Sequence, residues 1–269
     1  MEADKQPLVS IIMGVYNGAK RFEKPIESII NQTYPNWEFI ICDDGSQDDS
    51  FKKLQTFQEK DARIRVIKNE KNSGLSASLN HCLKYARGEY IARMDDDDIS
   101  HPNRLEEEVK FLAEHPEFAI VATGYRLMDE KGFWGKNDSY GERTALDIFR
   151  GRYFAHPTVM IRKEAYTAVG GYSTDSKIGR MEDVDLWCKM YSNGFKGYVM
   201  DAILYDYFES RNSMQRRKYK HRITEFKLKM KYRKEMGIPF ANSFLAAKTL
   251  LVGLLPPSII KRIHSIQYR

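Results

Sequence analysis

The sequence YIARMDDDD, residues 90–98, is the most informative part of the chain. Its apolar part, Tyr90–Met94, has the length and residue types of a short buried strand, and four carboxylates follow directly. Four adjacent negative charges repel one another unless a cation lies among them. A divalent cation that also binds a substrate phosphate meets this need, because hard cations take carboxylate and phosphate oxygens together. A solvated acidic turn is the alternative. We prefer the metal site because open α/β sheets bind ligands at the carboxyl ends of their strands.

The chain before this stretch alternates between strand-like and helix-like segments. Short apolar, β-branched runs predict buried strands, and apolar residues at helical spacing predict helices. The predicted strands are 7–18, 37–42, 64–67 and 90–94, and the predicted helices are 21–31, one after Ser46, and 75–86. This alternation with short connections predicts an α/β fold, in which helices flank both faces of a mainly parallel, Rossmann-like sheet.

A polar loop follows each predicted strand; the loops are 16–18, 43–45, 72–74 and 95–98. In a parallel sheet these loops share one edge, so we expect them to line one cleft. Asp95 and Asp97 can then hold Mg²⁺ or Mn²⁺. Asp43 or Asp44 can accept a hydrogen bond from a nucleobase or a ribose. The turn at Asn72–Gly74 allows the backbone to approach a phosphate closely.

The second half of the chain adds a further pair of carboxylates. We expect a helix from Pro102, strands at 119–124 and 157–161, a polar loop at 129–145 and a helix from Glu182 to about Asn193. Glu182 and Asp183 complement the dipole at the start of that last helix. A carboxylate opposite a metal-bound diphosphate can also act as a general base on a hydroxyl group. The segments together predict transfer of a group from a nucleotide diphosphate to an alcohol.

The start of the chain and its cysteines bear on its location. Residues 1–6 contain no apolar run, so we expect no signal peptide. Cys42, Cys82 and Cys188 lie far apart in strand-like or helical contexts, which is typical of buried thiols in a reducing compartment. We therefore expect a cytoplasmic protein.

Residues 211–269 differ in charge from the rest of the chain. They hold 15 basic and 2 acidic side chains, a net charge of +13, whereas residues 1–210 have a net charge of −7. The apolar run between Pro239 and Pro256 is shorter than the roughly 20 residues that a spanning helix needs. A basic, amphipathic tail favours peripheral binding to the inner face of the cell membrane. Packing on the rest of the chain, or on a second subunit in a homo-oligomer, is the alternative. We expect no nucleic-acid binding, because no reading motif accompanies the basic residues.

Seven short motifs occur in a characteristic order. They are VSIIMGVYN at 9–17, SIINQTY at 28–34, ICDDGS at 41–46, MDDDD at 94–98 followed by PNRL at 102–105, HPT at 156–158, GGY at 170–172 and EDVDLW at 182–187. As a set they resemble family 2 glycosyltransferases, which have the GT-A fold and a DXD segment. The likeness covers about residues 8–195, and the ordered set is far more specific than a single DXD.

The resemblance implies an inverting, metal-dependent glycosyltransferase that uses a nucleotide sugar, often a UDP-sugar. On the donor side, it implies that Val15, Tyr16 and Asn17 line the nucleoside pocket. It also implies that Asp43 contacts the base, and that Asp44 contacts the nucleoside or supports the residues that do.

The resemblance also assigns roles at the reacting atoms. It implies that Asp95 faces the ribose or the sugar and that Asp97 binds the metal. It implies that Asp183 is the base and that Glu182 lies beside it near the acceptor. The acceptor hydroxyl would attack the anomeric carbon in line while the metal stabilises the departing diphosphate.

The chain departs from the family pattern at a few positions. Members often carry Ala or Asn where Asp96 stands, so the acidic run has an extra carboxylate without an assigned role. Many relatives have a His after the base helix, but 207–213 reads YFESRNS and contains no His that could serve as a third protein ligand for the metal. We interpret His156 as a structural or acceptor-side histidine rather than as its substitute. Arg93 can either pair with the acidic run or touch substrate.

These observations lead to one main expectation about organisation and function. We expect a GT-A catalytic domain at 1–210, with a nucleotide-sugar half at about 1–98 and an acceptor half at about 99–210, before a helical tail at 211–269. The expected acceptor is a lipid-linked or surface-polysaccharide intermediate. The alternatives are a nucleotidyltransferase and a non-enzymatic protein that binds anionic surfaces.

Overall fold

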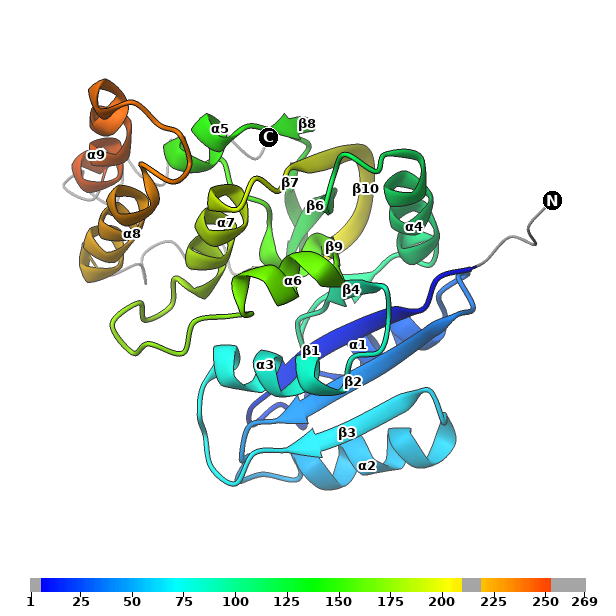
Figure 1. Cartoon of the computed structure of the whole chain (residues 1–269). Helices are drawn as coiled ribbons and strands as arrows, with labels where there is room; N and C mark the ends of the chain where they lie inside the picture. Colours follow the sequence, from blue (N-terminus) through cyan, green and yellow to red (C-terminus); the bar gives the residue numbers. More distant parts are fainter. Residues whose placement is uncertain (1–5, 210–218, 253–269) are drawn as a thin grey trace.

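One mixed sheet of ten strands forms the centre of the molecule in the computed structural model, which describes residues 6–209 and 219–252 (Figure 1). The strand order is β3-β2-β1-β4-β9-β6-β10-β5, with β7 paired to β6 and β8 paired to β10. The strands are β1 (Val9–Val15), β2 (Trp37–Asp43), β3 (Ile64–Lys68), β4 (Tyr90–Arg93), β5 (Ile99–Ser100), β6 (Ile120–Asp129), β7 (Gly132–Asn137), β8 (Gly141–Arg143), β9 (Val159–Arg162) and β10 (Gly197–Phe208).

Strand direction explains how distant loops meet. The pairing registers give β1, β2, β3, β4, β6 and β10 one common direction, while β9 runs antiparallel between β4 and β6. The loops after the first four strands therefore lie at one edge of the sheet, as the sequence predicted. The start of β9 reaches the same edge because that strand runs the opposite way.

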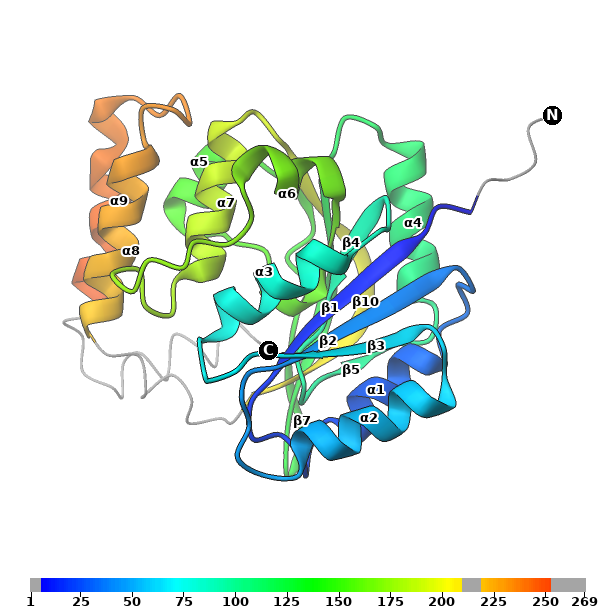
Figure 2. The ribbon, with the colours of Figure 1, turned by 60° about the horizontal axis from the view of Figure 1, so that its bottom comes forward.

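Helices cover both faces of the sheet, which confirms the predicted α/β class (Figures 1 and 2). Their bounds are α1 (Glu23–Ile30), α2 (Ser50–Lys60), α3 (Leu75–Tyr85), α4 (Arg104–Glu114), α5 (Ala145–Arg150), α6 (Lys163–Val169), α7 (Glu182–Ser192), α8 (Tyr219–Tyr232) and α9 (Ser243–Val252), with short 3₁₀ turns at His156–Thr158 and Phe240–Asn242. Alternate residues of β1 separate the two cores: Ile12 packs with α3, α6 and α7, whereas Ile11 packs with α1, α2 and α4.

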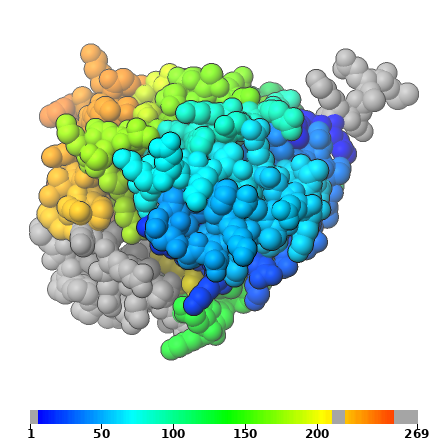
Figure 3. Space-filling view, turned by 90° about the horizontal axis from the view of Figure 1, so that it is seen from below, coloured from blue at the N-terminus to red at the C-terminus, as the bar shows by residue number. Residues whose placement is uncertain are grey.

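Two expectations about the second half of the chain were wrong. The segment 129–145 is not a polar loop, because it contains β7 and β8, which extend the sheet by antiparallel pairing with β6 and β10. Gly132 and Gly141 supply positive φ angles of 103° at the starts of these strands. The strand predicted from Pro157 begins only at Val159, because His156–Thr158 form a 3₁₀ turn. The hairpin of β6 and β7 projects at one side of the molecule (green in Figure 3).

The described part of the tail packs on the body of the chain. Helix α8 contacts α7, and α9 contacts both α8 and α5. Leu228 and Ala246 are buried in the same apolar core as α7. Some of the predicted features lie outside the described residues. These are the domain boundary at residue 210, residues 211–218 of the basic tail and the apolar residues after Val252. Within the described ranges, no helix is both long and apolar enough to cross a membrane.

Candidate active site

Asp44 holds two of the strand-end loops together. One of its carboxylate oxygens accepts hydrogen bonds from Asn69 Nδ2 (2.7 Å) and the Ser73 amide (2.9 Å), and the other accepts one from the Gly74 amide (2.8 Å). This side chain, which follows β2, therefore fixes the turn between β3 and α3. These hydrogen bonds indicate that Asp44 supports the residues of the site. Asn72 lies in the same turn and is exposed.

Asp43 has the opposite character, because part of its carboxylate is unused. It is fully buried at the end of β2, and Oδ1 accepts a hydrogen bond from the Ser46 amide (3.1 Å). Its Oδ2 atom has no hydrogen-bond partner among the residues that the structure describes. A buried acceptor without a partner is costly, so this oxygen suits a donor group from a ligand, such as a base N–H.

The loop after β1 is shaped by hydrogen bonds from the loop after β2. Asn17 has a left-handed backbone (φ 48°); its amide donates to Ser46 Oγ (2.9 Å) and its side-chain oxygen accepts from the Gln47 amide (2.9 Å). Tyr16 is exposed, whereas Val15 is buried at the end of the strand. The candidate nucleoside residues thus come together at one edge of the sheet.

The four aspartates after β4 have four different environments. Asp95 pairs with the buried Arg93 (2.7 Å), and Asp96 pairs with Arg21 (2.8 Å). Asp98 is buried and accepts a hydrogen bond from the Phe208 amide (2.7 Å), which ties the acidic loop to β10. Asp98 is therefore structural, and Arg93 pairs with the acidic run.

Asp97 is the carboxylate of this run best placed for a cation. Burial, together with the negative charges of Asp95 and Asp96, raises its pKa to about 7, against the opposing charge of Arg21. A bound divalent cation would relieve this repulsion. The residues fit a cation held jointly by Asp97 and phosphate oxygens, which is how Mg²⁺ is often bound. Among the described residues, no group of three or more His, Cys, Asp or Glu side chains could hold a metal by itself.

Glu182 and Asp183 begin α7, and the charge of Arg93, which precedes the acidic loop, acts on Glu182. Both are half-buried, and Asp183 Oδ1 accepts a hydrogen bond from the Val184 amide (2.8 Å). Burial and the adjacent Asp183 raise the pKa of Glu182 to about 6, while the positive charge of Arg93 lowers it. Since Arg93 also pairs with Asp95, its charge acts on both the acidic loop and the start of α7.

His156 is a structural residue beside the site. Its Nε2 atom is 2.9 Å from the Tyr172 hydroxyl, which is in turn 2.9 Å from the Tyr166 hydroxyl. Burial, assisted by the charge of Arg93, lowers the pKa of His156 well below its usual range. The ring is therefore neutral, and its hydrogen bond agrees with the structural interpretation.

Sequence reasoning missed two groups at this edge. Arg21, which pairs with Asp96, lies 75 residues earlier in the chain, and no local pattern marks it. Strand β10 brings Tyr205, whose hydroxyl accepts a long hydrogen bond from the Asp95 amide (3.4 Å), and Tyr207, whose pKa is raised by burial and by Asp95. The β-branched and aromatic residues of 203–208, with Tyr205 and Tyr207 two positions apart, were the available signal for this strand.

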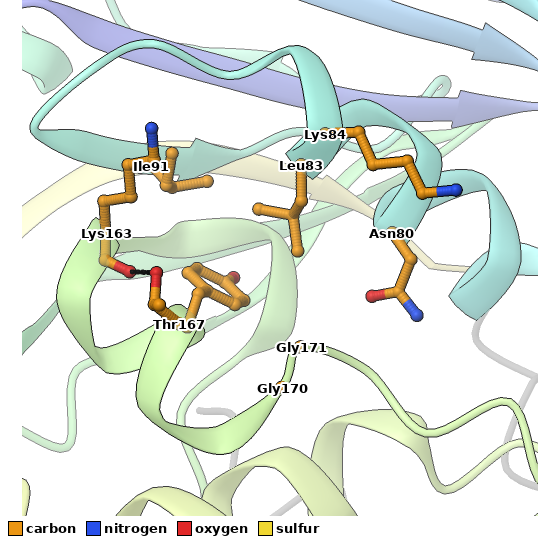
Figure 4. A pocket seen from close by; sticks show the side chains of 9 residues that line it. Asn80, Leu83, Lys84, Ile91, Lys163, Thr167, Gly170 and Gly171 are labelled. Carbon is orange, nitrogen blue, oxygen red and sulfur yellow. Dashed lines mark hydrogen bonds between the residues drawn. The ribbon is translucent and has the colours of Figure 1, made fainter.

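A pocket of about 380 Å³ lies elsewhere, between α3 and α6 (Figure 4). Asn80 and Lys84 line it from α3, and Lys163 and Thr167 line it from α6. None of the candidate donor, metal or base residues lines this pocket. Its volume therefore has no bearing on the chemistry of the acidic loop.

Comparisons with known proteins agree with this geometry. The chain matches the family described as "Glycosyl transferase family 2" over residues 10–185. It is 37% identical to the "Putative glycosyltransferase EpsE" of Bacillus subtilis (strain 168), over 96% of this chain and 93% of that protein. It is 36% identical, over 48% of this chain and 50% of that protein, to the Escherichia coli "UDP-Glc:alpha-D-GlcNAc-diphosphoundecaprenol beta-1,3-glucosyltransferase WfgD".

Solved structures share the fold at lower identity. S. aureus TarS 1-349 in complex with UDP-GlcNAc is 20% identical, with a TM-score of 0.69 over 91% of this chain and 71% of that one. The mannosyltransferase PcManGT from Pyrobaculum calidifontis, in complex with GDP-Man and Mn²⁺, is 19% identical, with a TM-score of 0.66 over 97% of this chain and 80% of that one.

Proposed function

Since the chain belongs to the family 2 glycosyltransferases, we propose that it moves a sugar, with inversion, from a nucleotide-diphosphate sugar to a hydroxyl group. The observation that carries the proposal is the presence of two groups of carboxylates: those of the strand-end loops, which we call the donor edge, and those at the start of α7, which we call the acceptor edge. Asp43 has a buried oxygen without a hydrogen-bond partner among the described residues, and Asp97 has a raised pKa, while Asp183 lies in the first turn of α7. Family membership favours this reaction over nucleotidyl transfer and over a purely binding role.

The reaction is a single displacement at the anomeric carbon. Asp183 takes the proton from the acceptor hydroxyl, the hydroxyl oxygen forms a bond to the anomeric carbon, and the bond from that carbon to the diphosphate breaks. The nucleoside diphosphate leaves with the bonding electrons. Attack from the face opposite the leaving group inverts the configuration, through a transition state with oxocarbenium character.

The donor residues bind and orient the nucleotide. Asp43 accepts a hydrogen bond from the base, and Asp44 keeps the turn at 73–74 in place beside the phosphates. Asp95 is oriented by Arg93 toward the ribose or the sugar, and Asp97 would hold Mn²⁺ or Mg²⁺. A bound divalent cation supplies charge stabilisation for the departing diphosphate.

The donor is proposed to be a UDP-sugar, a class that occurs in the names of the TarS complex and of WfgD. A thermal-shift panel of UDP-, GDP- and dTDP-sugars, each with and without Mn²⁺, tests this. UDP-sugars are expected to raise the melting temperature most, and only with the metal. In the Asp97→Asn variant the Mn²⁺-dependent part of that shift should disappear, whereas Asp138→Asn, an exposed control, should keep it. Failure of every nucleotide sugar to shift the wild-type protein would contradict the proposal.

The acceptor is proposed to be lipid-linked, and the protein to bind peripherally at the membrane. Phe244 and Leu251 of α9 are 67% and 65% exposed and recur at helical spacing, and Phe240, in the 3₁₀ turn before α9, is 73% exposed; these three residues form the apolar stripe. Exposed lysines occur close to them in the sequence, among them Lys234 and Lys248. An apolar stripe with a basic border suits an anionic membrane surface. The name of WfgD, which includes a diphosphoundecaprenol acceptor, supports the same class of acceptor.

A further inference from the structure

A single guanidinium joins the loop after β1 to the acidic loop. Arg21 Nε donates to Asp96 Oδ1 (3.0 Å), and Nη2 donates to Asp96 Oδ2 (2.8 Å). Two parallel N–H···O bonds of this kind fix orientation as well as distance. The two residues are 75 positions apart, so the pair is a tertiary contact between two of the loops that form the donor edge.

The same guanidinium also holds the backbone of the nucleoside loop. Its Nη2 atom donates to the Tyr16 carbonyl (3.1 Å), and its Nη1 atom donates to the Asn17 carbonyl (3.4 Å). Gly18 completes the contact, because a Cβ atom at this position would be only 2.7 Å from Asp96 Oδ2. The loop after β1 therefore lies in close contact with the acidic loop, and the hydrogen bonds of Arg21 hold the two loops together.

The charge of Arg21 also matters for the neighbouring aspartates. The side chain of Asp96 is only 12% exposed, so without its partner it would be a buried carboxylate beside Asp95 and Asp97. Removing one partner of such a pair leaves an uncompensated charge. Here that charge would sit next to the expected position of the diphosphate.

We propose that Arg21 and Asp96 form a positioning pair that fixes the nucleoside loop against the acidic loop and so sets the affinity for the nucleotide. The inference rests on the proposed function, because it assumes that this edge binds a nucleoside diphosphate. Neither side chain takes part in the chemical step. The pair gives Asp96, the carboxylate of the acidic run to which the sequence assigned no role, a part in organising the site.

Calorimetric titration with UDP and Mn²⁺ tests the pair without any need for turnover. Arg21→Ala should weaken UDP binding by about tenfold, which is within the range of coupling between residues in direct contact. Asp96→Ala should weaken it less, and the double variant should bind better than Arg21→Ala alone, because the unpaired carboxylate is then gone. Arg21→Lys keeps the positive charge but cannot donate two parallel hydrogen bonds to Asp96, so its affinity for UDP should lie between those of Arg21→Ala and the wild type.

Arg63→Ala is the matched control. Arg63 pairs with Asp61 through a similar fork (2.7 Å) and with similar exposure, but it lies before β3, at the opposite edge of the sheet. The Arg63→Ala variant should bind UDP with the same affinity as the wild type. Wild-type affinity in a folded Arg21→Ala variant, or strictly additive losses in the double variant, would overturn the pairing role. Absence of UDP, GDP and dTDP binding to the wild-type protein would instead contradict the proposed function, and this inference with it.

Discussion

At the scale of single residues, the site is organised by how charge is compensated. Arg93 and Arg21 each pair with one aspartate of the acidic loop, a backbone amide from β10 donates to one oxygen of the buried Asp98, and Asp97 has a raised pKa. The local sequence of four identical residues therefore becomes four distinct roles through contacts from other elements.

His156 supplies a prediction about pH and stability. Its pKa is depressed by burial, so below the ordinary value of about 6.5 the unfolded chain takes up a proton that the folded chain does not. The stability associated with the neutral ring is complete above that pH and is lost as the pH falls. We expect His156→Gln to shrink the difference in melting temperature between pH 7.5 and pH 5. His115→Gln, at a side chain that is 43% exposed, should leave it unchanged, and an unaltered difference in both variants would show that His156 does not contribute.

At the scale of elements, α8 and α9 are attached through a buried polar cluster. Lys229 is fully buried and pairs with Glu225 (2.7 Å), and it also donates to Thr249 of α9 (3.1 Å). The Tyr153 hydroxyl donates to Glu225 (3.0 Å) from the segment after α5. These contacts bind the described tail to the body and argue against its independence from the catalytic fold.

The cluster predicts the effect of a single charge deletion. Lys229→Ala removes the buried cation that pairs with Glu225 and should lower the free energy of unfolding by about 3–5 kcal/mol. Lys231→Ala, two residues along on the exposed surface, should cost less than about 0.5 kcal/mol. Denaturant unfolding measures both. The combined change Lys229→Met and Glu225→Leu should recover most of the loss; equal stabilities of the two single variants would contradict the attachment.

The elements also show what sequence can and cannot predict here. Strands β1, β2 and β4 are almost wholly buried, so they appear as near-continuous apolar runs and were predicted within a few residues. Strands β7 and β10 are half-exposed, and β10 carries register shifts, so their patterns are weak. The convergence of four loops followed from strand direction alone. The pairing of Arg21 with Asp96 depends on three-dimensional packing and left no pattern in the sequence.

At the scale of the whole molecule, the apolar stripe of Phe240, Phe244 and Leu251 provides a test of the proposed membrane binding. We expect the full chain to float with vesicles that contain anionic lipid and to be released by high salt, because screening weakens the basic border. Phe240→Ser with Phe244→Ser should reduce flotation while leaving the melting temperature close to that of the wild type, because both rings are exposed. Phe133→Ser, an exposed control on the β6–β7 hairpin, should float normally. Salt-insensitive flotation, or undiminished flotation of the double variant, would contradict membrane binding through this stripe.

The proposed transfer requires that the donor edge and the acceptor edge act on the same sugar. The most direct measurement compares Asp183→Asn with the wild type for UDP affinity and for sugar transfer to a hydroxyl acceptor. We predict unchanged UDP affinity and a loss of transfer of at least about a hundredfold, because removal of a general base affects only the chemical step. Glu182→Gln, at the adjacent position, should retain more activity. Full transfer by Asp183→Asn, or loss of UDP binding together with transfer, would contradict the account.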